Sequence, residues 1–428
     1  MRGTRAGRRL LLAGVAALAT LALARARLAA RPFADGLFFW VFAAQAAAYV
    51  AALRAEARLE PRERGAALVA ILALAIGFRA LLLPVPAFLT TDLERYRYDG
   101  ALVAAGANPY LRAPADALAE GAPLPPHARV HSIYPPLAQV TFALAARAGG
   151  SDLAFKALAV AGDLAALGAW LWLAPRTGWR ATRCVVWAWH PMVLWAFAGS
   201  GHVDALAIAL MLLALRALVG GRRGLAGAVL GAAAAVKLAP LALVPAWGRE
   251  LGRAAWLAPA VLLVAYAPFA GAGAGVAAGA EVYLRHWEHM GLVYEPVARL
   301  WRPGAARALC VAGWALCLGW AACSRRPVVE RTGGLVAGAL LLTPTLHPWY
   351  VCWVVPLCER VSGLPILTLS LSAVWGYGPL LGRPEWGSWG QTGWYWYFTW
   401  VPVAVACTAA HRSRLQELID DADASPRS

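Results

Sequence analysis

Residues 66–84 read AALVAILALAIGFRALLLP, a run of 19 residues that are almost all apolar. A helix of about 20 such residues crosses the hydrocarbon core of a bilayer. Similar blocks recur along the whole chain: 61% of the 428 residues are hydrophobic, whereas only 14% are charged. A soluble globular protein would leave many of these blocks exposed, and a disordered chain needs far lower hydrophobicity. The sequence therefore predicts an all-α polytopic membrane protein.

The apolar blocks number about thirteen, and some are too short or too broken to span a bilayer cleanly. We therefore expect a bundle of about 11–13 transmembrane helices that forms a single integral membrane domain over residues 1–428. The blocks are 8–26, 37–53, 66–84, 135–148, 153–174, 181–198, 203–219, 224–247, 254–270, 305–323, 334–357, 362–380 and 394–410.

The arginines between the blocks predict the orientation, because cytoplasmic loops carry an excess of Lys and Arg. They gather before residue 10, in 54–64, 176–183, 220–223 and 324–331, and at the start of the C-terminal tail. Both termini are then cytoplasmic, and the two long connections 85–133 and 271–304 face the extracytoplasmic side. These loops also account for the net charge of +16, which in a soluble protein would suggest nucleic-acid binding. Block 224–247 has basic residues at both ends, and a break at Lys237–Pro240 would let it leave and return.

The outer connection 85–133 contains the densest group of charged and aromatic residues, TDLERYRYDG over 91–100. In a helix, Asp92, Arg95, Tyr96 and Asp99 share one face, because they are spaced i, i+3, i+4 and i+7. Glu94 lies on another face. This segment is either a catalytic surface or a solvated amphipathic helix on the membrane. Tyr134 follows at the return to the membrane, where it can also be an aromatic anchor.

Further ionisable residues lie inside or beside the apolar blocks, where they are costly unless paired or functional. His202 and Asp204 follow a Gly-Ser-Gly turn, and a helix-capping His–Asp hydrogen bond is the alternative to a functional role. Lys237 lies within 224–247 and Asp163 within 153–174. Lys237 can neutralise a phosphate, or it can pair with Asp163 or Asp204.

Two more clusters mix aromatic and cationic side chains. Arg285, His286 and Trp287 lie in the second outer connection, where they suit a sugar or a lipid phosphate but are also typical of an interfacial belt. His347, Trp349 and Tyr350 interrupt an apolar block on the same side. Each cluster is a candidate for substrate binding.

The chain lacks a P-loop Gly-x-x-x-x-Gly-Lys motif, so a nucleoside triphosphate is not expected as the direct fuel. The polar connections are also too short to hold a nucleotide-sugar domain. An enzyme that works at the outer face would then take an activated donor from the membrane. Asp92 can accept the proton of a hydroxyl. Cationic residues such as Arg95 and Lys237 can stabilise a departing phosphate.

The order of these motifs resembles that of the GT-C superfamily of glycosyltransferases, in particular bacterial family 87-like mannosyltransferases that use polyprenyl-phosphate mannose. The resemblance spans about residues 85–357, although this chain has at least two apolar blocks before the acidic loop where many members have one. The motifs that carry it are Asp92 to Gly100, Asn108-Pro109-Tyr110, Tyr134-Pro135-Pro136, Gly201-His202-x-Asp204, Lys237-x-x-Pro240 and His347-Pro348-Trp349-Tyr350.

The resemblance implies a GT-C-like bundle with outer-loop helices, and Asp92 as the catalytic base. It also implies transfer of a sugar, mannose by resemblance, from a polyprenyl-phosphate donor to a hydroxyl of a glycolipid, polysaccharide or protein at the extracytoplasmic face. One base without a second nucleophilic carboxylate favours inversion, although Asp99 and Glu94 leave double displacement open. The residues indicate no definite cofactor. A divalent metal near the paired acids stays open, because the family includes both kinds of member, although no dedicated ligand set is evident. A lipid or small-solute transporter or flippase is the alternative, since broken helices with charges at membrane depth are typical of it too.

Overall fold

The computed structural model describes residues 5–117, 124–360, 363–381 and 393–424. Regular structure in these residues is helical, apart from isolated β-bridges that join His289 and Met290 to Thr345. Within the described residues, six helical segments are long and apolar enough to cross a membrane: Arg5–Ala30, Leu37–Glu56, Pro61–Leu82, Asp152–Thr177, Ala239–Ala272 and Pro303–Cys323. The predicted all-α polytopic membrane protein is confirmed. The total of about 11–13 spans stays a prediction, because the other apolar blocks form shorter helices.

The chain divides into two compact units, of which the first comprises Met1–Trp287 and Leu318–Ser324. The expectation of one integral membrane domain over residues 1–428 stays a prediction. The α-helices of the first unit are α1 (Arg5–Ala30), α2 (Leu37–Glu56), α3 (Arg64–Leu82), α4 (Asp92–Ala104), α5 (Pro114–Ala117), α6 (Pro136–Arg147), α7 (Asp152–Thr177), α8 (Val185–Ala188), α9 (Pro191–Leu194), α10 (Asp204–Val219), α11 (Arg223–Val236), α12 (Leu243–Leu251), α13 (Leu257–Tyr266) and α14 (Gly275–His286).

The second unit comprises Glu288–Cys317 and Arg325–Ser428. Its helices are α15 (Tyr294–Leu300), most of α16 (Pro303–Cys323), α17 (Val328–Leu342), α18 (Gly363–Ser372) and α19 (Gly393–Ala424). Short 3-10 segments, Pro348–Trp353 and Val355–Arg360, follow α17.

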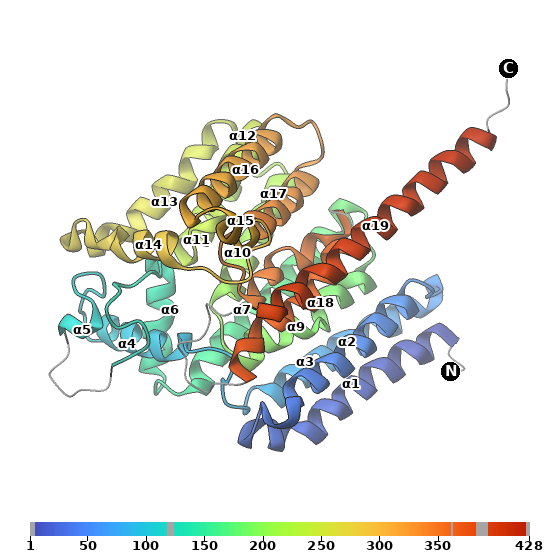
Figure 1. Cartoon of the computed structure of the whole chain (residues 1–428), viewed down its shortest axis with the longest axis horizontal. Helices are drawn as coiled ribbons and strands as arrows, with labels where there is room; N and C mark the ends of the chain where they lie inside the picture. Colours follow the sequence, from blue (N-terminus) through green and yellow to red (C-terminus); the bar gives the residue numbers. More distant parts are fainter. Residues whose placement is uncertain (1–4, 118–123, 361–362, 382–392, 425–428) are drawn as a thin grey trace. The chain divides into compact units, whose positions relative to one another are not determined.

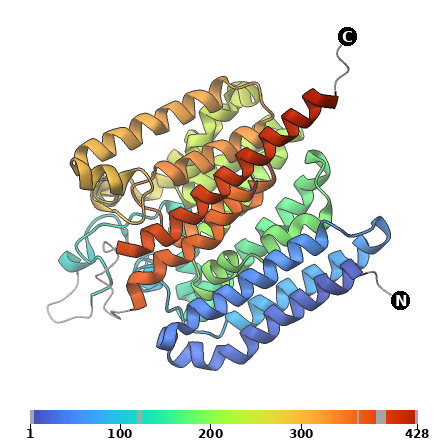
Figure 2. The ribbon, with the colours of Figure 1, turned by 45° about the vertical axis from the view of Figure 1, so that its right-hand side comes forward.

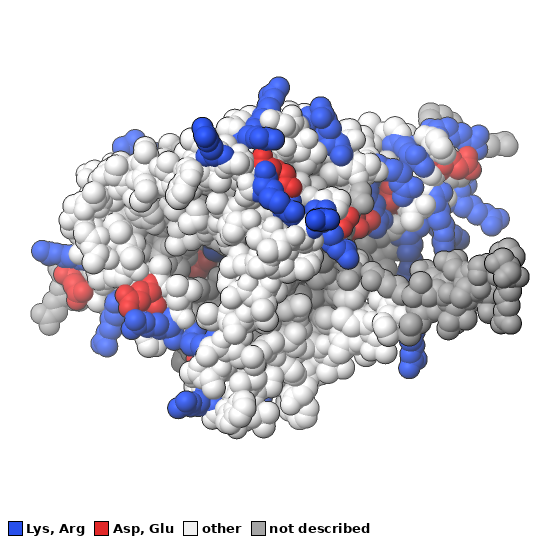
Figure 3. All heavy atoms as spheres, turned by 90° about the horizontal axis from the view of Figure 1, so that it is seen from above, with Lys and Arg blue, Asp and Glu red and all other residues white. Residues whose placement is uncertain are grey.

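In the first unit, α1 lies side by side with α2 and α3 (Figure 1 and Figure 2). Helix α7 packs on α10, and α10 packs on α11. Large apolar side chains such as Leu23 and Trp40 stand exposed on the candidate spans, as side chains that face lipid do. The surface in Figure 3 is correspondingly uncharged over wide areas, with Lys and Arg in discrete groups.

A buried ion pair ties α3 to α7 inside this bundle. The Arg79 guanidinium donates to both carboxylate oxygens of Asp163, at 2.6 and 2.9 Å, and both side chains are almost fully buried. Trp187 Nε1 also donates to Asp163 Oδ1 at 2.8 Å. Arg79 therefore neutralises the carboxylate of Asp163, and Lys237 is not needed as its counter-ion.

Connection 85–133, which the arginine distribution predicts to be extracytoplasmic, is folded largely against the bundle. Helix α4 packs on α6, and a Cβ on Gly100 would lie only 2.5 Å from the carbonyl oxygen of Phe142. Only glycine allows this close approach, which sets the depth at which α4 sits. Connection 271–304 contains α14 in the first unit and α15 in the second.

The predicted break near Lys237 is present. Helix α11 ends at Val236, Lys237 is extended with φ −149° and ψ 132°, and a 3-10 turn over Ala239–Ala242 leads into α12. Pro240 lies in this turn, where its missing N–H is tolerated. The break aims the Lys237 side chain away from a continuous helix surface and towards the start of α10.

Candidate active site

Asp92 is the first residue of α4, and its carboxylate is the part-exposed centre of a polar cluster. The Asp92 backbone N–H donates to Thr90 Oγ1 at 3.0 Å, which fixes the start of the helix. A helix N-terminus also stabilises a negative charge. The Asp92 side chain is 30% exposed, in contrast to the buried side chains around it. It can therefore be reached from outside the protein.

His202 and Tyr96 contact the same oxygen of Asp92. His202 Nδ1 lies 3.3 Å from Asp92 Oδ2, and the Tyr96 hydroxyl donates to this oxygen at 3.4 Å. His202 is fully buried just before α10, whereas Tyr96 lies one turn after Asp92 on α4. These contacts orient the carboxylate and leave its exposed side open.

Lys237 and Asp204 form the second part of the cluster. Lys237 Nζ lies 2.9 Å from each carboxylate oxygen of Asp204. Asp204 is fully buried at the first position of α10, whereas the Lys237 side chain is 26% exposed. The structure therefore selects Asp204 as the partner of Lys237. The ammonium group keeps an exposed side from which it can meet a second anion.

Two buried tyrosines, Tyr96 and Tyr134, lie on the inner side of Asp92. The rings of Tyr96 and Tyr134 meet edge to face at 5.0 Å, and Tyr96 stacks on Phe142 at 4.0 Å. Burial, followed by the negative charge of Asp92, raises the pKa of both Tyr96 and Tyr134 well above the ordinary value. Both hydroxyls are therefore neutral hydrogen-bond donors at physiological pH.

Asp99 shares a helix face with Asp92 but has a different environment. It is fully buried, and it accepts hydrogen bonds from Arg95 Nε at 2.9 Å, from Gln139 Nε2 at 3.2 Å and from the Ser132 hydroxyl. Arg95 also donates to the carbonyl of Val130 at 2.9 Å. Asp99 and Arg95 therefore hold the segment around residue 130 against α4.

The remaining predicted site residues of the first unit differ in how exposed their side chains are. Glu94 is exposed on α4. Arg285 is 71% exposed and pairs with Glu281 on the surface of α14 at 2.8 Å, and His286 is exposed beside it. Trp287 is half-buried, and its ring lies 5.4 Å from that of Tyr283. Of this predicted cluster, Trp287 contacts connection 85–133 through the ring of His127.

His127 is a site candidate that the sequence analysis missed. Its ring lies 4.9 Å from the Trp287 ring, and its φ of 55° is left-handed, which is uncommon for a residue with a side chain. Burial lowers the pKa of His127, Arg95 lowers it further, and Asp92 acts in the opposite direction. A histidine in an outer loop directly after Pro125-Pro126 was the available signal.

Helix α14 reaches this region because it packs closely on the outer loop. A Cβ on Gly279 would overlap the carbonyl oxygen of His131. The close contact brings Tyr283 and Trp287, one and two turns further on, to the loop that carries His127.

In the second unit, His347 is packed among aromatic rings. It stacks on Trp349 at 4.5 Å and on His289 at 5.3 Å, and it meets Tyr350 edge to face. His289 Nε2 lies 3.1 Å from the Gly376 carbonyl oxygen. These contacts form the interior of that unit. Across the described parts of both units, no group of three or more His, Cys, Asp or Glu side chains could hold a metal ion.

Comparison with known proteins gives one match. Residues 11–251 match the model of the MptA_B family, described as alpha-(1->6)-mannopyranosyltransferase, N-terminal domain. The matched segment covers more than half of the 428 residues and contains Asp92, His202, Asp204 and Lys237. No curated protein and no solved structure matches the chain.

Proposed function

The chain belongs to the MptA_B family of alpha-(1->6)-mannopyranosyltransferases, and we propose that it transfers mannose from a polyprenyl-phosphate donor to a hydroxyl of a glycan acceptor. The family and the apolar helices identify a membrane glycosyltransferase. The lipid-linked donor and the extracytoplasmic reaction are our proposals. The observation that carries them is that the part-exposed Asp92 carboxylate meets His202, two residues before the Asp204 that pairs with the part-exposed Lys237 ammonium group.

Asp92 is the proposed base. The acceptor hydroxyl gives its proton to the Asp92 carboxylate while its oxygen bonds to the anomeric carbon of the mannose. The bond from that carbon to the phosphate oxygen breaks, and the polyprenyl phosphate leaves with the electron pair. His202 contacts Asp92 Oδ2 at 3.3 Å and acts as a positioning residue. Proton transfer to a placed carboxylate is worth about 100- to 10,000-fold in rate.

Lys237 is the proposed partner of the leaving phosphate. Negative charge grows on the phosphate oxygen as the bond breaks, and a preorganised cation stabilises it. The exposed side of the Lys237 ammonium can contact the phosphate while Asp204 holds the group in place at 2.9 Å. His202, which contacts Asp92, and Asp204, which pairs with Lys237, are two residues apart at the start of α10, so the proposed base and cation lie at the same end of that helix.

The environments of the acidic residues favour inversion. A retaining enzyme needs a second carboxylate as nucleophile at about 5–5.5 Å from the first. Asp99 is fully buried and accepts hydrogen bonds from Arg95, Ser132 and Gln139, so it is not presented to a sugar. Direct displacement that gives an α-linked product requires a β-linked donor. We therefore expect β-linked polyprenyl-phosphate mannose to be used and the α anomer to be inert.

The aromatic residues suit the sugar ring. Tyr96 and Tyr134 line the inner side of the cluster, and Trp287 with His127 forms a neighbouring aromatic pair. Tyrosine and tryptophan combine an apolar face with a polar group, as carbohydrate recognition requires. We propose that Trp287 and His127, which are accessible, contact the transferred mannose, whereas the buried Tyr96 and Tyr134 support the Asp92 carboxylate from behind.

The reaction is tested with purified protein in lipid nanodiscs, radiolabelled polyprenyl-phosphate mannose and a mannose-terminated glycolipid. We expect labelled glycolipid and an equal amount of polyprenyl phosphate. Asp92→Asn keeps the size of the side chain and removes its basicity, so it should lower turnover by about 100-fold or more with donor binding retained. Glu94→Gln on the same helix is the matched control and should retain activity. In sealed liposomes, movement of the intact lipid-linked sugar between the leaflets without release of polyprenyl phosphate would instead identify the transporter.

A further inference from the structure

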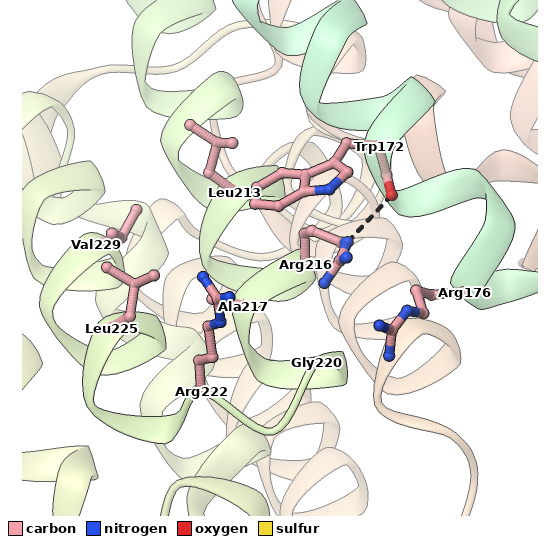
Figure 4. Close-up of a pocket in the computed structure, with 9 residues that line it drawn as sticks. All are labelled: Trp172, Arg176, Leu213, Arg216, Ala217, Gly220, Arg222, Leu225 and Val229. Atoms are coloured by element: carbon pink, nitrogen blue, oxygen red, sulfur yellow. Dashed lines mark hydrogen bonds between the residues drawn. The ribbon is translucent and has the colours of Figure 1, made fainter.

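A cavity of about 330 Å³ lies at the other end of α7 and α10 from the Asp92 cluster, between these helices and α11. Its size falls within the range of about 300–1,000 Å³ that is typical of ligand pockets. Arg176, Arg216 and Arg222 line it together with apolar side chains (Figure 4). None of the residues in this cavity contributes to the proposed reaction.

Trp172, which also lines the cavity, holds the side chain of Arg216 in place. Its guanidinium lies 4.4 Å from the centroid of the Trp172 ring, and its Nε donates to the Trp172 carbonyl at 3.1 Å. A Cβ on Gly220 would lie 2.7 Å from Arg216 Nη1, so the glycine provides the space for this group. The fixed guanidinium therefore keeps its remaining N–H groups for another partner.

The other two arginines lie on either side of Arg216 in Figure 4. Within the residues that the structure describes, no carboxylate forms a salt bridge with Arg176, Arg216 or Arg222. Three like charges around one cavity repel each other unless an anion lies between them. Guanidinium groups bind phosphate oxygens through paired N–H donors.

The apolar part of the lining favours the phosphate group of a lipid over a free phosphate ion. Trp172, Leu213, Leu225 and Val229 supply an apolar wall that a free phosphate ion would not use. The cavity also lies at the C-terminal end of α7, a candidate membrane span, with Trp172 and Arg176 in its last two turns. Tryptophan and arginine in such positions lie at the level of the lipid headgroups.

We propose that this cavity binds an anionic phospholipid, with its phosphate on the three arginines and the start of one acyl chain against the apolar wall. The site is separate from the Asp92 cluster, so the proposal does not depend on the glycosyl-transfer reaction. By the arginine distribution it lies at the cytoplasmic surface. A bound lipid would neutralise the arginines and tie together the ends of α7, α10 and α11.

Native mass spectrometry of the detergent-purified full chain with dioleoyl phosphatidylglycerol tests the proposal. We expect a saturable first lipid whose binding weakens by about fivefold for each arginine replaced, and by about a hundredfold in Arg176→Ala/Arg216→Ala/Arg222→Ala. Arg223→Ala is the matched control, because Arg223 adjoins Arg222 but does not line the cavity. Val229→Trp fills the cavity without a charge change and should also abolish the first binding step.

Three further outcomes would overturn the proposal. Equal binding of phosphatidylglycerol by the wild type and the triple variant would show that the arginines are not the site. Equal affinity for dioleoyl phosphatidylcholine would show that negative charge is not recognised. Binding of glycerol phosphate as tight as that of the lipid would identify a soluble phosphate as the ligand. Thermal unfolding of each variant in detergent establishes that it is folded.

Discussion

Replacing Lys237 by Met should damage both stability and catalysis, and the two effects can be separated. Lys237 Nζ lies 2.9 Å from both oxygens of Asp204, whose side chain is fully buried. Lys237→Met leaves this carboxylate without its cation. Removal of one partner from a buried pair costs about 3–5 kcal/mol. Because Lys237 itself is 26% exposed, we expect a loss near the lower end, about 3 kcal/mol.

The double variant Lys237→Met/Asp204→Asn removes both charges. It no longer buries an unpaired carboxylate, so most of the lost stability should return. The proposed contact of the ammonium with the leaving phosphate stays absent. A hydrogen bond to a charged group is worth about 1.5–3 kcal/mol, so turnover should remain about 10- to 150-fold below that of the wild type.

The assay pairs thermal unfolding in detergent with steady-state release of polyprenyl phosphate, and it measures kcat and KM separately for each variant. Asp204→Asn alone, which keeps Lys237, should retain more activity than the double variant. Recovery of both stability and turnover in the double variant would refute the reasoning. Lys237 would then act only as the counter-ion of Asp204.

Three other outcomes follow from the same contacts. Asp163→Asn should destabilise the protein by about 3–5 kcal/mol, because it leaves the buried Arg79 guanidinium without its anion. The KM for the donor should not change. Thermal unfolding measures the first effect and steady-state kinetics the second. Burial lowers the pKa of His127 in the folded protein, so the unfolded chain binds more protons below its ordinary pKa of about 6.5. Stability should thus fall as the pH drops through this range, and a His127→Gln variant whose unfolding has the same pH slope as the wild type would contradict this role. A single cysteine at Asp116 in a cysteine-free background should react with an impermeant thiol reagent from the extracytoplasmic side; labelling only from the cytoplasm would reverse the proposed topology.

The architecture could be predicted because its signals are local. A run of apolar residues such as 66–84 determines a membrane helix by its length and composition alone. The break at Lys237–Pro240 could be predicted from one proline and from the basic residues at both ends of its block. The acidic face of α4 follows from the i, i+4 spacing of helical residues. None of these inferences requires knowledge of which segments meet.

The roles of the charged residues could not be assigned in this way, because each depends on contacts between distant segments. Asp92 and Asp99 share a face of α4, and Arg95 is close enough in sequence to pair with either. The loop that carries Val130 and Ser132 decides between them, since the Ser132 hydroxyl donates to Asp99 and the Val130 carbonyl accepts from the Arg95 that pairs with Asp99. Gln139 on α6 adds a third donor to Asp99. Asp92 keeps its exposed side as a result.

The same reason applies to the other pairs. Lys237 had two candidate partners in the sequence, and the meeting of α3 with α7 left only Asp204 for it, since Asp163 pairs with Arg79. His127 gains its role from Trp287, which is 160 positions away in the chain and reaches it only because α14 packs on the outer loop. Hydrophobic length and helical period are properties of a segment, and sequence alone determined them. The partner of a buried charge is set by the three-dimensional contacts between helices, because a buried charge is costly unless an opposite charge or hydrogen-bonding groups meet it.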